Sequence, residues 1–562
     1  MGIFILRGCG QMVFRALSRL VLRMVPRRQR SAIPSQRGSD PQISLTGKLS
    51  KNLRENESLI RDTFGNSSDL VIRKLRFGSG PGIAMLVVHI DGLVDSALIS
   101  DAVIRPIAVT PEFFEMDKQS SARVRDRIRD GLISVSDISE VSDKSDFLTA
   151  IAEGKCGIII DGSPDAFVCD IGGFEMRNLE EPMNEVAIRG PREGFCEVLR
   201  VNTSLLRRRI RSPRLWIEEF AVGRISRTQV EIVYLKGIAD EKLVQEARER
   251  IRRIDIDSIQ ESGQLEEYIE DAPYSPFPTI LRTERPDRVV GGLLEGRIAI
   301  LTDGTPFALI VPVTITMFLT SPDDYFERSF IASAERLIRH TSFFVGLFLP
   351  SLYVAVTTFH YEMLPTTLVI AIAAQHEGIP FPAVFEAFLM EVSFEILREA
   401  AVRLPNVFGP AISVVGVLIL GEAAVRAGLA SSVMIIIVAL TAIASFVTPI
   451  FSLSVAVRLL RFPMIFLAGS LGLFGVVFGF SIMAIHLASL RSFGIPYLAP
   501  IAPIVSSDQK DVFVRLPWWK LDTRPEFTGK RDVRRQARGL KPHPPEPRRK
   551  QAPSSQRKKR SR

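Results

Sequence analysis

Cysteine is scarce in this sequence, and its polar half lacks the motifs that identify many nucleotide- and metal-dependent enzymes. The four cysteines, Cys9, Cys156, Cys169 and Cys196, form no C-x-x-C pair and have no histidine at zinc-ligand spacing. This argues against both a zinc site and a disulfide framework, and it fits a reducing compartment. Residues 55–300 contain no G-x-G-x-x-G, no Walker loop and no H-E-x-x-H. No nucleophile–base pair stands out there either, so we expect no catalytic site, cofactor or metal.

Long apolar runs are absent from residues 1–300 and are concentrated in residues 305–505. Overall, 46% of the 562 residues are hydrophobic, and such a content exceeds that of an ordinary soluble protein. A membrane span needs roughly 20 mostly apolar residues to cross about 30 Å of hydrocarbon. Residues 506–562 return to polar, basic sequence. The chain is therefore predicted to have a soluble part, an α-helical multi-span membrane domain and a basic, largely disordered tail.

The soluble part shows the alternation of β-rich runs and amphipathic helices that is typical of α/β domains. Residues 82–104 predict a buried strand, a tight turn and a helix. Residues 156–171 predict a hairpin around an Asp-Gly-Ser-Pro turn. A second strand–helix unit is predicted over 230–253. We expect two α/β subdomains, 55–175 and 176–300, after a basic N-terminal extension and linker, 1–54.

The membrane domain, residues 301–505, is predicted to contain about four spans: 342–364, 409–425, 430–451 and 462–490. Residues 304–319 are short and carry two prolines, so we expect a buried or interfacial segment. Residues 366–404 are broken at Gly378-Ile379-Pro380 and then become charged, which favours interfacial helices. Six spans, counting 366–397 and a split of 462–490, are the alternative.

Both ends of the chain are predicted to be cytoplasmic. The N-terminal part is large and preceded by arginine-rich sequence, and residues 541–562 contain nine Lys or Arg against one Glu. The positive-inside rule then requires an even number of spans. Four spans satisfy it, although they place Arg458 and Arg461 on the outer side. For the tail, 506–562, contact with membrane lipid and simple solvation remain open, and we expect no nucleic-acid partner.

A stripe of glutamates is the first candidate site. On a helix, Glu391, Glu395 and Glu399 repeat every four residues along one face, with Arg403 continuing it. The stripe could be the solvated, self-paired face of an interfacial helix, with pairs such as Glu395–Arg398 and Glu399–Arg403. Alternatively, it could line a water-filled cation path, as acidic rings do in cation channels.

Two further sets of residues are candidates for packing and contacts. Gly469, Gly472, Gly475 and Gly479 recur at the small-residue spacing that lets another helix approach closely. Arg189, Arg192, Arg207, Arg208 and Arg209 cluster in one polar stretch that also holds glutamates. Salt bridges between subdomains or between subunits are the favoured role of these arginines, and an anion site is the alternative.

The sequence resembles the A subunits of spore germinant receptors, the GerA family of spore germination proteins, from about residue 55 to 530. In the soluble part the likeness is carried by "HIDGLVD" (89–95), "EEPMNEVAIRGPREGFCEVLRVNTSLLRRRI" (180–210) and "TERPD" (283–287). Beyond it, the likeness is carried by "GRIAILTDGTPFALIVP" (296–312), "FLPSLYVAVTTFH" (348–360), "GIPFPAVFEAFLMEVSFEILREAAVRLP" (378–405) and "RPEFTG" (524–529).

The resemblance implies a multi-pass protein of the spore inner membrane. It implies a transporter-like B subunit and a lipoprotein C subunit as partners, and a response to small nutrients. It also implies homo-oligomers of A subunits that form a cation-conducting path whose opening starts germination. An accessory spore-membrane ion channel subunit and a transporter subunit are the alternatives, although no second copy of any span, as an inverted repeat would give, is visible.

Overall fold

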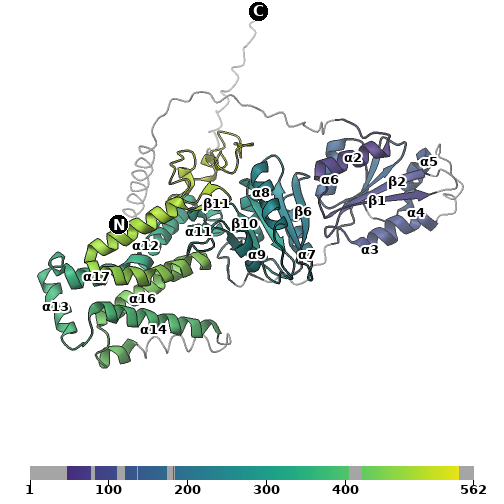
Figure 1. The fold of residues 1–562 in the computed structure, drawn as a ribbon. Helices are drawn as coiled ribbons and strands as arrows, with labels where there is room; N and C mark the ends of the chain where they lie inside the picture. The colour runs from purple at the N-terminus through teal and green to yellow at the C-terminus, as the bar shows by residue number, and fades with distance from the viewer. Residues whose placement is uncertain are drawn as a thin grey trace, which may run out of the picture.

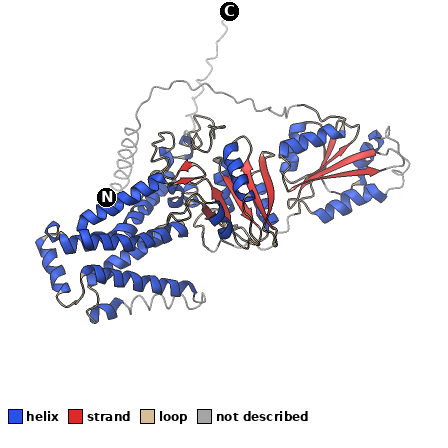
Figure 2. Cartoon of the chain, in the orientation of Figure 1, coloured by secondary structure: helices blue, strands red, loops and turns tan. Residues whose placement is uncertain are grey.

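The computed structural model describes residues 47–77, 83–109, 121–173 except 134 and 136, 181–403 except 183, and 421–542. Three parts follow one another in space: a first sheet with its helices, a second sheet with its helices, and a bundle of long helices (Figure 1). Figure 2 shows that the strands lie in the two sheet-containing parts, apart from one short pair of strands beside the bundle. The expected division into an N-terminal α/β region and a C-terminal helical region is confirmed at this level.

The first part is a five-stranded antiparallel sheet covered by helices on both faces. Its strands run in the order β1-β2-β4-β5-β3. They are β1 (Leu70–Phe77), β2 (Ile83–Ile90), β3 (Ile138–Val141), β4 (Cys156–Ile160) and β5 (Ala166–Cys169). The hairpin predicted at 156–171 is confirmed, because β4 pairs with β5 antiparallel.

Alternating residues of β2 explain the two covered faces of this sheet. Leu86 and Val88 pack with helices α2 (Leu53–Phe64) and α6 (Lys144–Ala152). Met85 and Val87 pack with the helices of the opposite face. Those are η1 (Ile99–Ile104), α4 (Arg105–Val109), α5 (Ser121–Arg127) and η4 (Ile128–Leu132), which follow the short helix α3 (Ser96–Leu98). A strand buried on both faces reads as a continuous apolar run, as β2 does.

The second part repeats this architecture, with the strand order β6-β7-β9-β10-β8. Its strands are β6 (Leu215–Val222), β7 (Thr228–Leu235), β8 (Leu281–Thr283), β9 (Ile298–Thr302) and β10 (Ala308–Val311). Helices α7 (Leu199–Arg209) and α10 (Pro286–Leu294) cover one face. Helices α8 (Glu241–Arg252) and α9 (Ser262–Ile269) cover the other.

The domain boundary expected at residue 300 falls inside β9 and is therefore wrong. Strand β10 lies within the stretch 304–319 and belongs to the second sheet, not to the helical bundle. Its apolar character has a simple cause, since all four residues of β10 are buried. Helix α11 (Ile315–Leu319) and the turn η5 (Pro322–Tyr325) then lead into the bundle.

The bundle contains α12 (Ser329–Phe359), α13 (Thr366–His376), α14 (Ala383–Arg403), α16 (Ser432–Val447) and α17 (Phe451–Ser489), with the turn η6 (Tyr361–Met363) after α12. Two of them, α12 and α17, are long and apolar enough to cross a membrane. The predicted spans 342–364 and 430–451 coincide roughly with α12 and α16. Most of the predicted span 409–425 lies outside the described residues.

Helix α17 is not one continuous straight helix, although a single span over 462–490 would require one. Gly472 has φ 62° and ψ −142°, a conformation open only to glycine, and the chain folds back there. A Cβ on Gly479 would meet Met464, and one on Gly475 would meet the carbonyl of Leu467. Residues 15 apart lie about 22 Å apart along a straight helix, so these contacts show that 451–471 and 473–489 form a helical hairpin.

After α17 the chain returns to the soluble part and packs between it and the bundle. This segment contains β11 (Arg491–Ser492), β12 (Ile495–Pro496), η7 (Gln509–Asp511) and η8 (Trp518–Lys520). The tail predicted from 506 is therefore wrong up to residue 542, since Arg524 and Thr528 donate to carbonyls at the end of α10. Residues 543–562 lie outside the described part.

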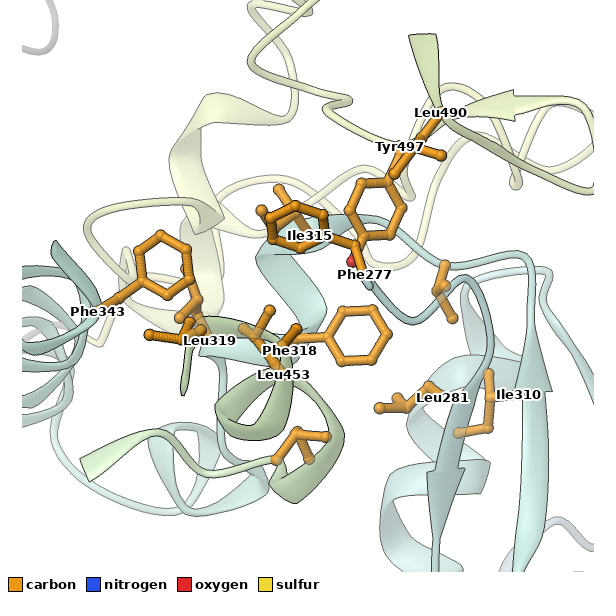
Figure 3. Packing of buried hydrophobic residues seen from close by; sticks show 14 of the residues in the cluster. Phe277, Leu281, Ile310, Ile315, Phe318, Leu319, Phe343, Leu453, Leu490 and Tyr497 are labelled. Atoms are coloured by element: carbon orange, nitrogen blue, oxygen red, sulfur yellow. The ribbon is translucent and has the colours of Figure 1, made fainter. Parts of the chain in front are cut away.

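One hydrophobic core joins the second sheet to the bundle. Figure 3 shows Leu281 and Ile310 of the sheet facing a group from α11, the bundle and the returning segment. That group includes Phe318, Phe343, Leu453 and Tyr497. The second sheet and the ends of α12 and α17 therefore share one continuous core.

Candidate functional site: charged pairs in the bundle

Glu391 of α14 and Arg461 of α17 form an ion pair inside the bundle. Arg461 Nη1 lies 2.5 Å from Glu391 Oε2, and its Nε donates to the carbonyl of Gly346 in α12 at 2.8 Å. Both residues are 3% exposed. Glu391 Oε1 and Arg461 Nη2 have no hydrogen-bond partner. A buried pair with unmatched polar atoms is costly to keep, so it marks this point as a candidate for function.

The rest of the stripe becomes progressively more exposed along α14. Glu395, with 42% of its side chain exposed, pairs with Arg458 of α17. Glu399 and Arg403 pair with each other at 2.7 Å and are 62% and 78% exposed. The expected Glu399–Arg403 pair is therefore present, whereas Glu395 pairs with Arg458 and not with Arg398.

Arg398 instead lies against α16, where it donates to Ser445 Oγ at 3.2 Å and its guanidinium sits 4.4 Å from the centre of the Phe446 ring. Arg458 and Arg461, which are three residues apart on α17, are the partners that sequence reasoning missed. Two arginines three residues apart on an otherwise apolar helix could have indicated acidic partners on a neighbouring helix, because arginines inside a bundle need carboxylates opposite them.

The candidate glycines lie at tight contacts within the chain. A Cβ on Gly469 would approach Val384 of α14 to 2.1 Å, and one on Gly472 would approach His360 to 2.7 Å. Gly475 and Gly479 face the other half of their own hairpin. Their described contacts are therefore with α14, the end of α12 and α17 itself.

A second polar cluster closes the end of the bundle far from the sheets. Glu386 of α14 is fully buried, and its Oε1 accepts from the Ser431 backbone N–H and from Ser431 Oγ, at 2.5 and 2.6 Å. Its Oε2 lies 3.6 Å from His376 Nδ1. Tyr353 Oη lies 3.4 Å from His376 Nε2. The cluster ties α12, α13, α14 and the start of α16 together.

The five candidate arginines of the soluble part do not form one site. Arg207 is 1% exposed and makes two hydrogen bonds to Asp69, of 2.8 and 2.9 Å, across the two soluble parts. Arg209 pairs with Glu193 at 2.8 Å. Arg189 and Arg192 pair with Glu327 and Glu181, at 3.2 and 3.1 Å, and both arginines are largely exposed. Arg208 accepts a hydrogen bond through its carbonyl from Arg211.

The first turns of α12 are anchored to the soluble side by buried charges. Arg336 donates to Asp324 at 3.1 Å and to Asp511 at 2.8 Å. Arg339 donates to the same Asp324, at 2.9 Å. Tyr325 Oη donates to Asp511 at 2.8 Å. This junction fixes α12 to η5 and to the segment that returns after α17.

The family model described as Bacillus/Clostridium GerA spore germination protein matches residues 58–527. The chain belongs to the GerA family. The resemblance drawn from the sequence motifs is thereby confirmed. Both the junction and the charged pairs of the bundle lie inside the matched range.

Individual relatives match nearly the whole of this GerA-family chain. It is 43% identical over 509 residues to spore germination protein KA of Bacillus subtilis (strain 168), covering 91% of this chain and 92% of that protein. It is 44% identical over 478 residues to the uncharacterized membrane protein YfkQ of the same organism, covering 85% and 91%.

A solved structure also resembles this GerA-family chain. It is the N-terminal domain of the A subunit of the Bacillus megaterium spore germinant receptor GerK3. The sequence identity is 36%, the TM-score is 0.37, and the match covers 47% of this chain and 96% of that one.

Proposed function

We propose that this chain is the A subunit of a nutrient germinant receptor in the spore inner membrane, with a signalling role and no catalytic one. The family match over residues 58–527 and relatives named as spore germination proteins support this role. In it, the chain works with a transporter-like B subunit and a lipoprotein C subunit. Co-purification of B- and C-type partners with a tagged chain from spores tests this assignment.

We further propose six membrane crossings with both termini in the cytoplasm. The path of the chain supports this number. Helix α12 leads away from the sheets and α14 leads back. Gly428 is again at the far end, where it lies close to the carbonyl of Gly378. Helix α16 and the two halves of α17 add three more passes. In this topology Arg458 and Arg461 lie within a crossing, paired with Glu395 and Glu391 of α14, and not in a loop on the outer side.

The proposed oligomer and cation path rest on one observation, the exposure of the charged side chains at the end of the glutamate stripe. Among the described residues, Glu399 and Arg403 are 62% and 78% exposed on a helix of an apolar bundle. Ionised side chains facing hydrocarbon are expensive, so this face requires water or neighbouring subunits. Oligomerisation would bring the stripes of several subunits together around a water-filled path, in which glutamates raise the local cation concentration.

Potassium efflux after nutrient addition tests the path. We expect Glu395→Gln, and more strongly the triple change of Glu391, Glu395 and Glu399 to Gln, to slow efflux at equal receptor abundance. Glu422→Gln is a matched control, because Glu422 forms a comparable exposed pair with Arg426 at 2.5 Å. Efflux rates equal to wild type in the triple variant would exclude the conducting role of the stripe.

An accessory spore-membrane ion channel that senses no nutrient is the second candidate. The similarity to YfkQ, at 44% identity, is as high as that to protein KA, at 43%. The family takes in an uncharacterized membrane protein as well as spore germination proteins, so membership by itself does not separate a receptor subunit from an accessory subunit. If the tagged chain recovers no B- or C-type partner but its deletion still slows potassium release, the accessory role is favoured.

A further inference from the structure

A cavity with both charged and apolar lining residues lies where the second sheet, the linker into the bundle and the returning segment meet. It has a volume of about 100 Å³. One water molecule needs only about 10–15 Å³ measured in this way, so the cavity can hold a molecule of several heavy atoms. Its charged lining residues are Glu295, Arg297, Asp508 and Asp511, and Tyr325, Thr316 and Thr528 add hydroxyl groups.

Arg297 supplies an unmatched donor at this cavity. The residue is 5% exposed, and its Nη1 donates to the carbonyl of Pro312. Its Nε has no hydrogen-bond partner and lies 3.5 Å from Glu295 Oε2. Glu295 is already engaged by Arg535 at 3.0 Å. The ion pair with Glu295 is therefore long, and Glu295 shares it with Arg535, so the Nε–H remains available to the carboxylate of a ligand or to a water molecule.

Asp508 supplies the complementary unmatched charge. Its carboxylate accepts from the Glu526 backbone N–H at 2.9 Å and from Ser507 Oγ at 2.8 Å. Among the described residues, no Lys or Arg lies within ion-pair distance of it. Asp511 differs, because Arg336 and Tyr325 occupy its two oxygens. Burial raises the pKa of Asp508 and lowers the pKa of Arg297, as is expected of charges that lack a full set of partners.

We propose that this cavity binds a small zwitterionic solute, with its carboxylate on Arg297 and its ammonium group on Asp508. A divalent metal fits less well, because no group of three His, Cys, Asp or Glu side chains suited to a metal exists among the described residues. In the proposed topology the cavity faces the compartment that holds both termini. It is therefore a site for an internal solute, distinct from the conducting path.

Binding at this site is coupled to the bundle through shared residues. Asp511 and Tyr325 line the cavity. Asp511 also accepts a hydrogen bond from Arg336 of α12, and Tyr325 donates to Asp511. A ligand that bridges Arg297 and Asp508 connects the second sheet to the returning segment. It therefore stabilises the junction from which α12 begins.

Calorimetric titration of the full-length chain in nanodiscs tests the site. The probes are glycine and β-alanine, with acetate and methylammonium as single-charge probes. We expect saturable binding of a zwitterion at least tenfold tighter than that of either single-charge probe. Asp508→Asn should weaken zwitterion binding at least tenfold and leave acetate binding unchanged. Arg297→Lys, which keeps the charge and removes Nε, should weaken both zwitterion and acetate binding.

Asp532→Asn is the matched control, since Asp532 lies in the same segment, does not line the cavity and pairs with Arg524 at 3.1 Å. Each variant is checked for an unchanged melting temperature. The site is excluded if no probe saturates, if Asp508→Asn binds the zwitterion like wild type, or if the control loses binding equally. Failure of this binding test would exclude the solute site and would leave the efflux test of the conducting path unaffected.

Discussion

Asp69 and Arg207 form a buried contact between the two soluble parts, with each side chain 1% exposed. Removing one partner of such a pair leaves the other charge buried and unmatched, which costs about 3–5 kcal/mol. We expect Asp69→Asn to lower the free energy of unfolding of the soluble part by an amount of this order, as measured by urea denaturation.

Arg192→Gln provides the comparison for that measurement. Arg192 pairs with Glu181, but both side chains are more than half exposed. Exposed pairs contribute about 0–1 kcal/mol, so this change should have little effect on urea denaturation. Equal destabilisation by Asp69→Asn and Arg192→Gln would contradict the structural role of the buried pair.

Glu231 of β7 gives the soluble part a specific pH dependence. It is 1% exposed, accepts from Ser68 Oγ of the first part at 2.8 Å, and lies 3.8 Å from Arg200. Burial raises its pKa to about 7 from a usual value of 4.5. The folded state therefore holds a proton that the unfolded state releases between these values, and stability falls as the pH rises from about 4.5 to 7.

Glu231→Gln should remove this pH dependence. The amide keeps an acceptor for Ser68 and carries no charge to bury. We expect the variant to exceed wild type in unfolding free energy at pH 8 by up to about 3 kcal/mol, and to match it near pH 4.5. Parallel urea curves of both proteins at the two pH values measure this. A constant difference between the proteins at both pH values would show that Glu231 does not titrate in this range.

The fold of helix α17 depends on the backbone conformation of a single residue, Gly472. Gly472 adopts φ 62° and ψ −142°, and Gly475 faces the carbonyl of Leu467 with no room for a side chain. Both requirements arise because the two halves of α17 pack directly on each other. Helices α12, α14 and α16 pack against this hairpin, so a bulky side chain there cannot be relieved by moving one helix alone.

Gly475→Leu should reduce the amount of folded protein in the membrane, because the added side chain meets backbone. Gly378→Ala is the matched control, since a Cβ there meets nothing within 4 Å. Quantitative immunoblots of membrane fractions compare the two variants with wild type. A Gly475→Leu variant at wild-type abundance would show that the halves of α17 do not pack in this way.

At the scale of the whole molecule, the bundle places the turn after α13 opposite the sheets. His376 and Glu377 lie at the end of α13, far from both soluble parts (Figure 1). In the proposed six-crossing topology, this turn and the termini lie on opposite sides of the membrane. We expect an epitope inserted after Glu377 to react with antibody only from the side that neither terminus reaches, in intact and inverted vesicles. An epitope that reacts from the same side as the termini would exclude this topology.

The sequence by itself determined those features that depend on neighbouring residues. The β4–β5 hairpin follows from two β-rich runs around a tight-turn sequence, and the separation of soluble and helical parts follows from the distribution of apolar runs. Strands β1 and β6 were missed because two consecutive charged residues, Arg73-Lys74 and Glu218-Glu219, interrupt their apolar pattern, and charged residues are common in strands at the edge of a sheet. Ordered motifs across the chain sufficed to recognise the family.

Only the tertiary structure decided which residues meet across long distances in the chain. Glu391 and Arg461 are 70 positions apart, and Asp69 and Arg207 are 138 apart. No local pattern predicts such a pair, because each partner is chosen by how whole helices and sheets pack. The fold-back at Gly472 has the same origin: four glycines at small-residue spacing permit close packing, but only the surrounding helices determine that one of them becomes a turn. The extension of the second sheet past residue 300 likewise depends on β10 pairing with β8 and β9.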